Sequence, residues 1–454
     1  MNVLAAKAAP VPDKAPSMLT IVTFTWTCCF AAWTIFSIIG VRIQQDLGLS
    51  ETEFALLISA PILTGSVSRL FLGIASERYG GRLLTTLMML LSAAATWLLT
   101  AAESYTGFLL AALGVGLAGG VFITGISFVA GWFPQRLHGS VFGLFGLGNL
   151  GAAITNFAAP LLLVSIGWQG TARVYAAVLA VVAVVFWLLS AEDPGTLSRR
   201  SGGNRLTLAD QIRPLRYTRV WRFGLYYFFA FGAFVALASW LPRYYIGYYG
   251  LSITQAGLLT AVFSLSAAVF RAFGGWLSDR WGPRRVMYWT FSASLLCLLV
   301  ISYPPTTYII EGIEGPITFS TRTAMLPFTI VTFVLGFFMA LGMAAVYKHI
   351  PAYYPDSVGT VGGLVGMIGG LGGFVLPIVF GVLNQFTGIW TTAFMALFGL
   401  VLVNLLWMHH AIQRMQEQLH PDLAGPQYLP EGVPEDALQA IQLEPHSASN
   451  RGGP

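Results

Sequence analysis

Charged side chains are scarce in this sequence. Asp, Glu, Lys and Arg make up 9% of its 454 residues, and the hydrophobic set AVILMFWYC makes up 56%. Soluble domains carry about 25% charged residues, so the deficit excludes an ordinary water-soluble protein and predicts a membrane protein. Cysteine is also rare: Cys28, Cys29 and Cys297 all lie in apolar stretches. They predict neither a disulfide framework nor a metal site.

Long apolar runs fill most of the chain. About 20 apolar residues cross a bilayer as one helix, and runs of that length number twelve. The sequence therefore predicts an all-α membrane protein, with twelve transmembrane helices in two six-helix bundles. The expected spans are 18–40, 53–75, 83–101, 105–130, 139–164, 171–189, 222–246, 254–277, 286–304, 327–348, 359–384 and 389–410.

Polar stretches divide the chain into five regions. The first apolar run is longer than the roughly 7–15 residues of a secretory h-region, so we expect the first helix to remain in the protein. The predicted regions are a cytoplasmic tail at 1–17, bundles at 18–190 and 222–410, a cytoplasmic linker at 191–221, and a disordered cytoplasmic tail at 411–454.

Basic residues are distributed unequally between the two sides of the predicted membrane. With the N-terminus inside, most of the 24 Lys and Arg residues fall in cytoplasmic segments, and the outer loops hold only Arg42, Arg173, Arg243 and Arg322. This positive-inside bias predicts a protein of the cytoplasmic membrane with both termini in the cytoplasm. The net charge of +5 thus indicates contact with a lipid bilayer and needs no nucleic-acid partner.

One motif occurs twice. Arg69 begins RLFLGIASERYGGR, and Arg271 begins RAFGGWLSDRWGPR, so the arginine, glycine, serine, acid and arginine positions recur in register. The repeat predicts a duplicated bundle with one buried arginine in each half. The rest of the motif is predicted to pack the cytoplasmic helix ends and pair across a gate. These gating residues are Gly73, Glu77, Arg78, Arg82, Gly275, Asp279, Arg280 and Arg284.

A glycine pattern supplies a second repeat. Gly148 and Gly151 in the fifth span match Gly369 and Gly372 in the eleventh. Small residues at this spacing let membrane helices approach closely. We expect these two helices to rock against each other, with the four glycines as gating positions.

Arg69 and Arg271 are the two basic residues left deep inside predicted spans, and no carboxylate remains there to pair with them. Arg69 precedes Glu77 by eight residues, or about 12 Å along a helix. A charge at such depth costs about 2.5–3.5 kcal/mol on insertion scales, so we expect a mobile anion to compensate it. The guanidinium fork suits nitrate, nitrite, formate or bicarbonate. Alternatively, the arginines bond backbone carbonyls and hold the halves together.

The duplicated loops, twelve spans and long linker resemble the major facilitator superfamily. Within it, residues 18–410 resemble the nitrate/nitrite porter family, through the two arginines, GGVF at 119–122 followed by WFP at 132–134, and the glycine-rich stretches 146–151 and 366–373. The resemblance implies that both arginines bind the anion and that aromatic rings sandwich it. The substrate-binding residues it implies are Arg69, Arg271, Asn149, Phe122, Tyr227, Phe231 and Tyr347. For Asn149, helix packing is an equal alternative.

The resemblance implies a secondary active transporter for nitrate, and for nitrite, that works by alternating access as a monomer. The lack of a buried acid favours nitrate/nitrite exchange. In contrast, Lys348 and His349 resemble the proton-coupled branch, so they are candidate coupling residues, and proton-linked uptake is slightly favoured.

An exchanger of oxalate or formate stays open, as does a receptor that senses an anion without moving it. Enzymatic activity is not predicted, because no nucleophile, base or metal cluster accompanies the arginines. No cofactor is expected.

Overall fold

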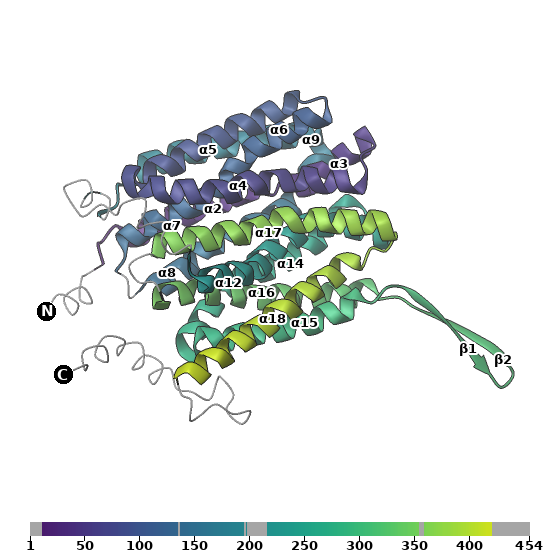
Figure 1. The fold of residues 1–454 in the computed structure, drawn as a ribbon. Helices are drawn as coiled ribbons and strands as arrows, with labels where there is room; N and C mark the ends of the chain where they lie inside the picture. Colours follow the sequence, from purple (N-terminus) through teal and green to yellow (C-terminus); the bar gives the residue numbers. More distant parts are fainter. Residues whose placement is uncertain (1–10, 135–136, 195–196, 198–215, 354–357, 420–454) are drawn as a thin grey trace, which may run out of the picture.

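The computed structural model describes residues 11–134, 137–194, 197, 216–353 and 358–419 (Figure 1). Most of both predicted tails and of the linker lie outside these residues. The side chains of Glu77 and Arg78, within a helix, also lie outside the description, so the gating prediction for them is not tested.

Six membrane-crossing segments form the N-terminal half. The first consists of α2 and α3, the fourth is a long helix interrupted by a 3-10 turn, and the fifth and sixth follow each other directly in the chain. The elements are α2 (Ala15–Trp33), α3 (Phe36–Leu47), α4 (Glu51–Tyr79), α5 (Gly81–Leu98), η1 (Leu99–Ala101), α6 (Tyr105–Val115), η2 (Gly116–Gly120), α7 (Val121–Trp132), α8 (His138–Phe145), η4 (Gly146–Asn149) and α9 (Leu150–Leu189).

Eleven helices among the described residues are long and apolar enough to cross a membrane. One of them, Ser140–Leu189, is 50 residues long, and a straight helix of that length would far exceed a hydrocarbon core of about 30 Å. It breaks at Gly167, where φ is 72° and ψ is 175°, a conformation open to glycine because it lacks a Cβ atom. This stretch therefore supplies two spans, and the twelve-helix prediction is confirmed.

The C-terminal half repeats the arrangement. Its first segment contains a π-helical turn, η6, between two α-helices. The elements are α12 (Thr218–Tyr227), η6 (Phe228–Ala233), α13 (Phe234–Tyr249), α14 (Ile253–Trp281), α15 (Pro283–Ser302), β1 (Thr306–Gly312), β2 (Gly315–Thr321), α16 (Met325–Tyr353), α17 (Val358–Thr387) and α18 (Thr392–Leu419).

The strands β1 and β2 add a small hairpin to the mostly α-helical fold. They form an antiparallel hairpin in which Thr306 pairs with Thr321, and it projects beyond the helices (Figure 1). The rings of Tyr308 and Phe319 stack across the strands with centroids 5.1 Å apart. The expected spans leave this segment outside the membrane, between residues 304 and 327. We call this end of the molecule the hairpin end, and the end where α2 begins and α18 finishes the tail end.

Both arginine-bearing helices begin in the same way. Ser50 and Glu53 form a capping box at the start of α4, and Ser252 and Gln255 form one at the start of α14. Each box satisfies backbone N–H groups at a helix start. Since Arg69 and Arg271 each follow their serine by 19 residues, the two caps bring the arginines to the same depth.

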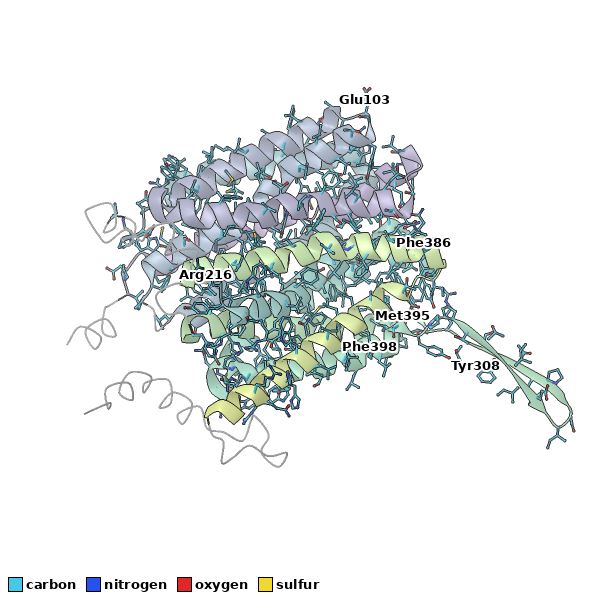
Figure 2. All side chains as sticks on the ribbon, viewed as in Figure 1. Glu103, Arg216, Tyr308, Phe386, Met395 and Phe398 are labelled. Carbon is cyan, nitrogen blue, oxygen red and sulfur yellow. The ribbon has the colours of Figure 1, made fainter. Side chains whose placement is uncertain are left out.

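The two halves meet along α4 with α17 and along α9 with α14. Side chains fill the space between these helices (Figure 2). The labelled Arg216 lies at the tail end, whereas Glu103 and Phe386 lie at the opposite end, from which the hairpin with Tyr308 extends. The arginine pair therefore lies inside the bundle, on helices that form the boundary between the halves.

Candidate functional site

Arg69 is completely buried, with 0% of its surface exposed. Its Nε atom donates to the carbonyl oxygen of Gly119 at 3.2 Å, and its Nη1 atom donates to that of Gly366 at 3.0 Å. The first carbonyl belongs to the N-terminal half and the second to the C-terminal half. Part of the alternative interpretation of the arginines is thus observed, because Arg69 does bond backbone carbonyls of both halves.

Three aromatic rings surround the guanidinium of Arg69. Its Cζ atom lies 5.1 Å from the ring centroid of Trp33, 5.0 Å from that of Phe122 and 5.1 Å from that of Phe231. Each cation–π contact contributes about 0.5–2 kcal/mol, with the higher values at desolvated sites. These rings hold the charge in place without neutralising it.

Arg271 is 3% exposed. Its Nη2 atom donates to the hydroxyl oxygen of Tyr227 at 3.3 Å, and its Cζ atom lies 5.7 Å from the ring centroid of Phe122 and 6.0 Å from that of Tyr347. The glycine of the fifth span is required here, because a Cβ atom on Gly146 would lie 2.7 Å from the Arg271 side chain. The absence of a side chain at Gly146 therefore leaves room for the side chain of Arg271.

The aromatic residues implied by the resemblance form one connected group. Tyr227 and Phe231 stack with centroids 5.1 Å apart at an angle of 4°, and Tyr347 meets the ring of Tyr227 edge-on at 5.0 Å. Phe122 lies 6.0 Å from Tyr347 and 6.5 Å from Phe231. The structure thus brings all four aromatic residues to the two arginines.

Three nitrogen atoms of the arginine pair lack an acceptor. They are Nη2 of Arg69 and both Nε and Nη1 of Arg271, each buried and without a hydrogen-bond partner among the described residues. A buried donor left unsatisfied costs about 1–3 kcal/mol, and more when it is charged. No salt bridge is formed by either arginine in this part of the chain. The site is therefore a buried cationic cluster that is surrounded by aromatic rings and retains unused hydrogen-bond donors.

Asn149 is buried and already engaged. Its Oδ1 atom accepts a hydrogen bond from Trp26 Nε1 at 3.3 Å, and its Nδ2 atom contacts the Met343 sulfur at 3.8 Å. These contacts provide the packing role that was considered for it. A contact between Asn149 and the anion stays a prediction.

Trp33 was missed by the sequence reasoning. It was one of 13 Trp residues with no repeat partner to mark it. Two neighbouring glycines leave room for the Trp33 ring. A Cβ atom on Gly65 would lie 2.6 Å from this ring, and one on Gly119 would lie 2.4 Å from it. Gly119 belongs to the GGVF stretch, so that motif makes room for Trp33.

A small cavity of about 30 Å³ extends from the site towards the tail end. It is lined by Arg271, Tyr347 and Gly275, and it reaches the ion pair between Lys348 and Asp279. A Cβ atom on Gly275 would meet no atom within 4 Å. We call this cavity the passage, since it lies between Arg271 and the Lys348–Asp279 ion pair on the tail side.

The hairpin end is closed by an ion pair between the halves. Arg243 of α13 pairs with Glu51 of α4, and each side chain is 20% exposed. The guanidinium of Arg243 also lies 5.0 Å from the ring centroid of Trp390, and Gln44 donates to Glu51 at 3.3 Å. The charge distribution in the sequence placed Arg243 in an outer loop but did not pair it with Glu51, because 192 residues separate the two.

Further contacts between the halves lie towards the same end. Asn156 of α9 donates to the carbonyl oxygen of Ala238 and to the hydroxyl of Ser264, both at 3.3 Å. Thr52 of α4 bonds Gln385 of α17. The halves are therefore joined by polar contacts from the arginine pair to the hairpin end.

The predicted gating residues at the tail end make contacts within their own half. Arg82 bonds Ser190 and the carbonyl oxygen of Trp187, whereas Arg284 bonds Tyr353. Two further residues of this set make fewer polar contacts. The guanidinium of Arg280 lies over Trp276, and a Cβ atom on Gly73 would make only an ordinary 3.5 Å contact with Ile123. Pairing across a gate at this end stays a prediction.

The four glycines of the second repeat also face their own half. Cβ atoms on Gly148 and Gly151 would lie 2.0 Å and 2.2 Å from α2, and those on Gly369 and Gly372 would lie 2.2 Å and 2.6 Å from α12 and η6. Other glycines of α17 face the opposite half, since Cβ atoms on Gly370 and Gly373 would lie 2.3 Å from Ser66 and 2.9 Å from Ile62.

The two candidate coupling residues point to different places. Lys348 pairs with Asp279 beside the passage. His349 instead bonds the carbonyl oxygen of Ala345 through Nδ1 at 2.8 Å and stacks on Tyr353 with centroids 6.1 Å apart. The structure therefore separates the two residues that the sequence grouped.

The fold and the arginine pair agree with the comparisons to known proteins. The chain matches the family model described as "Major Facilitator Superfamily" over residues 21–321 and 249–418, so it belongs to that superfamily of membrane transporters and is not an enzyme. Among solved structures, the human organic anion transporter MFSD10 shares the fold with a TM-score of 0.66 at 17% identity, covering 87% of this chain and 100% of that one.

Sequence relatives place the chain more narrowly. It is 41% identical over 422 residues to a protein of Thermus thermophilus named "Probable nitrate/nitrite antiporter NarK1", covering 90% of this chain and 94% of that one. It is 30% identical to the "Nitrite extrusion protein" of Bacillus subtilis, over 84% of this chain and 91% of that one. The chain belongs to the nitrate/nitrite porter family of the superfamily.

Proposed function

We propose that this protein carries nitrate, and also nitrite, across the cytoplasmic membrane by alternating access, with its tail end in the cytoplasm. The observation that carries the proposal is the pair of buried guanidinium groups with three N–H-bearing nitrogen atoms lacking an acceptor among the described residues. The names of the relatives support the choice of anion. The chain is proposed to act as a monomer within the lipid bilayer.

The anion would lie between Arg69 and Arg271. A planar nitrate presents oxygen atoms in one plane, which suits the fork geometry of guanidinium. Phe122 contacts both arginines through its ring, so it would limit the thickness of the ligand and favour a flat anion. Tyr227, Phe231 and Tyr347 would complete this aromatic wall.

The arrangement of contacts supports a direction for the movement. In this conformation the ion pair of Glu51 with Arg243 closes the hairpin end, while the passage extends from Arg271 towards the tail end as far as Asp279 and Lys348. Release to the tail side would use the passage. Loading from the hairpin side would require the halves to separate there, which breaks that ion pair.

We propose two modes of coupling and give the favoured one first. Proton-linked nitrate uptake comes first, with Lys348 and His349 as the coupling residues; Lys348 pairs with Asp279 beside the passage. Nitrate/nitrite exchange comes second. It is favoured by the position of His349, which faces away from the passage, and by the antiporter name of a relative.

Nitrate uptake into proteoliposomes distinguishes the two modes. Vesicles would be empty or preloaded with nitrite, with and without an inward proton gradient. Acceleration by the gradient in empty vesicles would establish proton-linked uptake, and acceleration by internal nitrite alone would establish exchange. No nitrate movement under any of these conditions would contradict the proposed function, and oxalate and formate would then be tested.

A further inference from the structure

A second basic cavity lies at the tail end of the C-terminal half, between α12, α15, α16 and α18. Its volume is about 30 Å³. It is distinct from the passage, because Lys348 lines the passage and the next residue, His349, lines this cavity. We call it the arginine cavity. Its polar lining consists of Arg219, Arg222, Arg284, His349, Tyr226 and Tyr353.

Arg284 is incompletely satisfied. Its Nη2 atom donates to the hydroxyl oxygen of Tyr353 at 2.6 Å and contacts the Met415 sulfur at 3.9 Å. Its Nη1 atom is buried and has no hydrogen-bond partner in the described part of the chain. Arg219 approaches the same tyrosine from its face, with its Cζ atom 4.6 Å from the ring centroid. Tyr353 therefore holds two guanidinium groups close together.

The charge of this cavity is uncompensated by its described lining. Three arginines contribute to it, and none of the lining residues is Asp or Glu. None of the three forms a salt bridge among the residues that the structure describes. Like charges held together in a partly desolvated space repel one another, so an anion bound here would relieve both the repulsion and the unsatisfied Nη1 atom.

The duplicated motif supplies an internal comparison. Arg82 occupies the position in the N-terminal half that Arg284 occupies in the C-terminal half. Arg82 is satisfied by Ser190 and by the carbonyl oxygen of Trp187, and its Cζ atom lies 4.2 Å from the Trp187 ring centroid. A structural helix-end arginine therefore finds its partners within its own bundle. Arg284 also bonds within its own bundle, but its Nη1 atom has no partner among the described residues, and it faces a cavity that holds two more arginines.

We propose that the arginine cavity binds a phosphate group from the cytoplasmic side, either as inorganic phosphate or as the headgroup of an anionic phospholipid. Several oxygen atoms on one tetrahedral anion match three converging guanidinium groups, and arginine forks bind phosphate in a bidentate manner. One wall of the cavity is apolar, formed by Met408, Ala411 and Ile412 of α18. This wall suits the glycerol and first methylene groups of a lipid, and basic pockets between helices at this face bind such headgroups.

Binding at this place would connect the ends of four helices. The phosphate would bridge Arg219 and Arg222 of α12 to Arg284 of α15, while α16 contributes His349 and Tyr353. The opposite face of α16 carries Tyr347 and Lys348 towards the passage. Occupancy would therefore stabilise the C-terminal half beside the passage. This inference does not depend on which anion the central site carries.

Thermal unfolding of the purified full-length protein in a neutral detergent tests the inference. The midpoint would be measured with added phosphatidylglycerol, phosphatidylcholine or inorganic phosphate, for the wild type and for Arg284→Gln and Arg222→Gln. The matched control is Arg414→Gln, because Arg414 is an exposed arginine at the same end of α18 and does not line the cavity.

The expected result is a midpoint that rises in the wild type and in Arg414→Gln, with at least half of the rise lost in each cavity variant. A ligand that binds only the folded state stabilises it by RT ln(1 + [L]/Kd), so a weakened site gives a smaller shift even where the variant starts from a lower midpoint. A rise with phosphatidylglycerol alone identifies a lipid headgroup, and an equal rise with inorganic phosphate identifies the free anion.

Two outcomes would overturn the inference. One is the absence of any shift with phosphatidylglycerol and phosphate beyond that with phosphatidylcholine. The other is an equal shift in the wild type, both cavity variants and Arg414→Gln, which would indicate general attraction of anions to a basic surface. If one cavity variant fails to fold, the other still decides between these results.

Discussion

Glu51 of α4 and Arg243 of α13 form an ion pair that joins the two halves at the hairpin end. The pair is supported by the Trp390 ring and by Gln44. At the same end α17 approaches α4 closely, because a Cβ atom on Gly381 would lie 2.8 Å from the carbonyl oxygen of Glu51. Opening of this end must therefore separate the charged groups as well as the helices.

Removing this ion pair should favour opening at the hairpin end. We expect Glu51→Gln to raise the rate at which an impermeant maleimide labels a cysteine placed at Ser239 by about tenfold. In the wild type, Ser239 is 2% exposed. Loss of one partner of a partly buried pair costs about 1–3 kcal/mol, and 1.4 kcal/mol is tenfold in an equilibrium. The background would lack the three native cysteines.

Two variants make this test specific. The swapped pair, Glu51→Arg with Arg243→Glu, should restore low labelling. Arg42→Gln should leave labelling unchanged, because the ion pair of Arg42 with Asp46 is exposed and lies within one helix. If Glu51→Gln labels no faster than the parent, the ion pair does not hold the end closed.

The shared ring of Phe122 should contribute to anion affinity. We expect Phe122→Leu to weaken nitrate binding about tenfold, since the substitution removes one cation–π contact from each arginine while keeping an apolar side chain. Isothermal titration of the purified protein with nitrate measures the effect. The matched control is Phe128→Leu in the same helix, because Phe128 packs against Trp132 and Phe186 instead. Equal affinities of both variants would remove Phe122 from the site.

Gly146 should be required because of its contact with Arg271. We expect Gly146→Ala to reduce nitrate uptake about tenfold or more, since the new methyl group would lie 2.7 Å from the Arg271 side chain and displace it. Gly399→Ala in α18 provides the control, because a Cβ atom there would meet no atom within 4 Å and the residue does not line the passage. Uptake by both variants at the wild-type rate would show that the position of Arg271 is not critical.

The sequence predicted most of the architecture for physical reasons. Apolar runs of bilayer length gave the twelve spans, and the repeat around Arg69 and Arg271 gave two halves with matched arginines. The helix breaks at Gly167, which lies in the gap that the sequence left between the fifth and sixth predicted spans. The hairpin of β1 and β2 was not predicted, because strand pairing outside the membrane leaves no trace in a reading based on apolar length.

The site was predicted less completely. The arginines and four aromatic residues were identified, and the structure brings them together. Trp33 was missed because an aromatic residue in an apolar helix carries no signal of what it faces. The pairing of Glu51 with Arg243, and the different directions of Lys348 and His349, depend on how distant helices pack. Charge counts along the chain do not contain that information.

The central claim is that the two buried guanidinium groups bind the transported anion together. Nitrate binding and nitrate uptake should be measured for Arg69→Lys, Arg271→Lys and the exposed control Arg42→Lys. Each buried variant keeps a positive charge but loses the fork of donors, so we expect both signals to fall by about a hundredfold, or about 2.8 kcal/mol, while the control matches the wild type. Wild-type binding and uptake by both buried variants would contradict the claim.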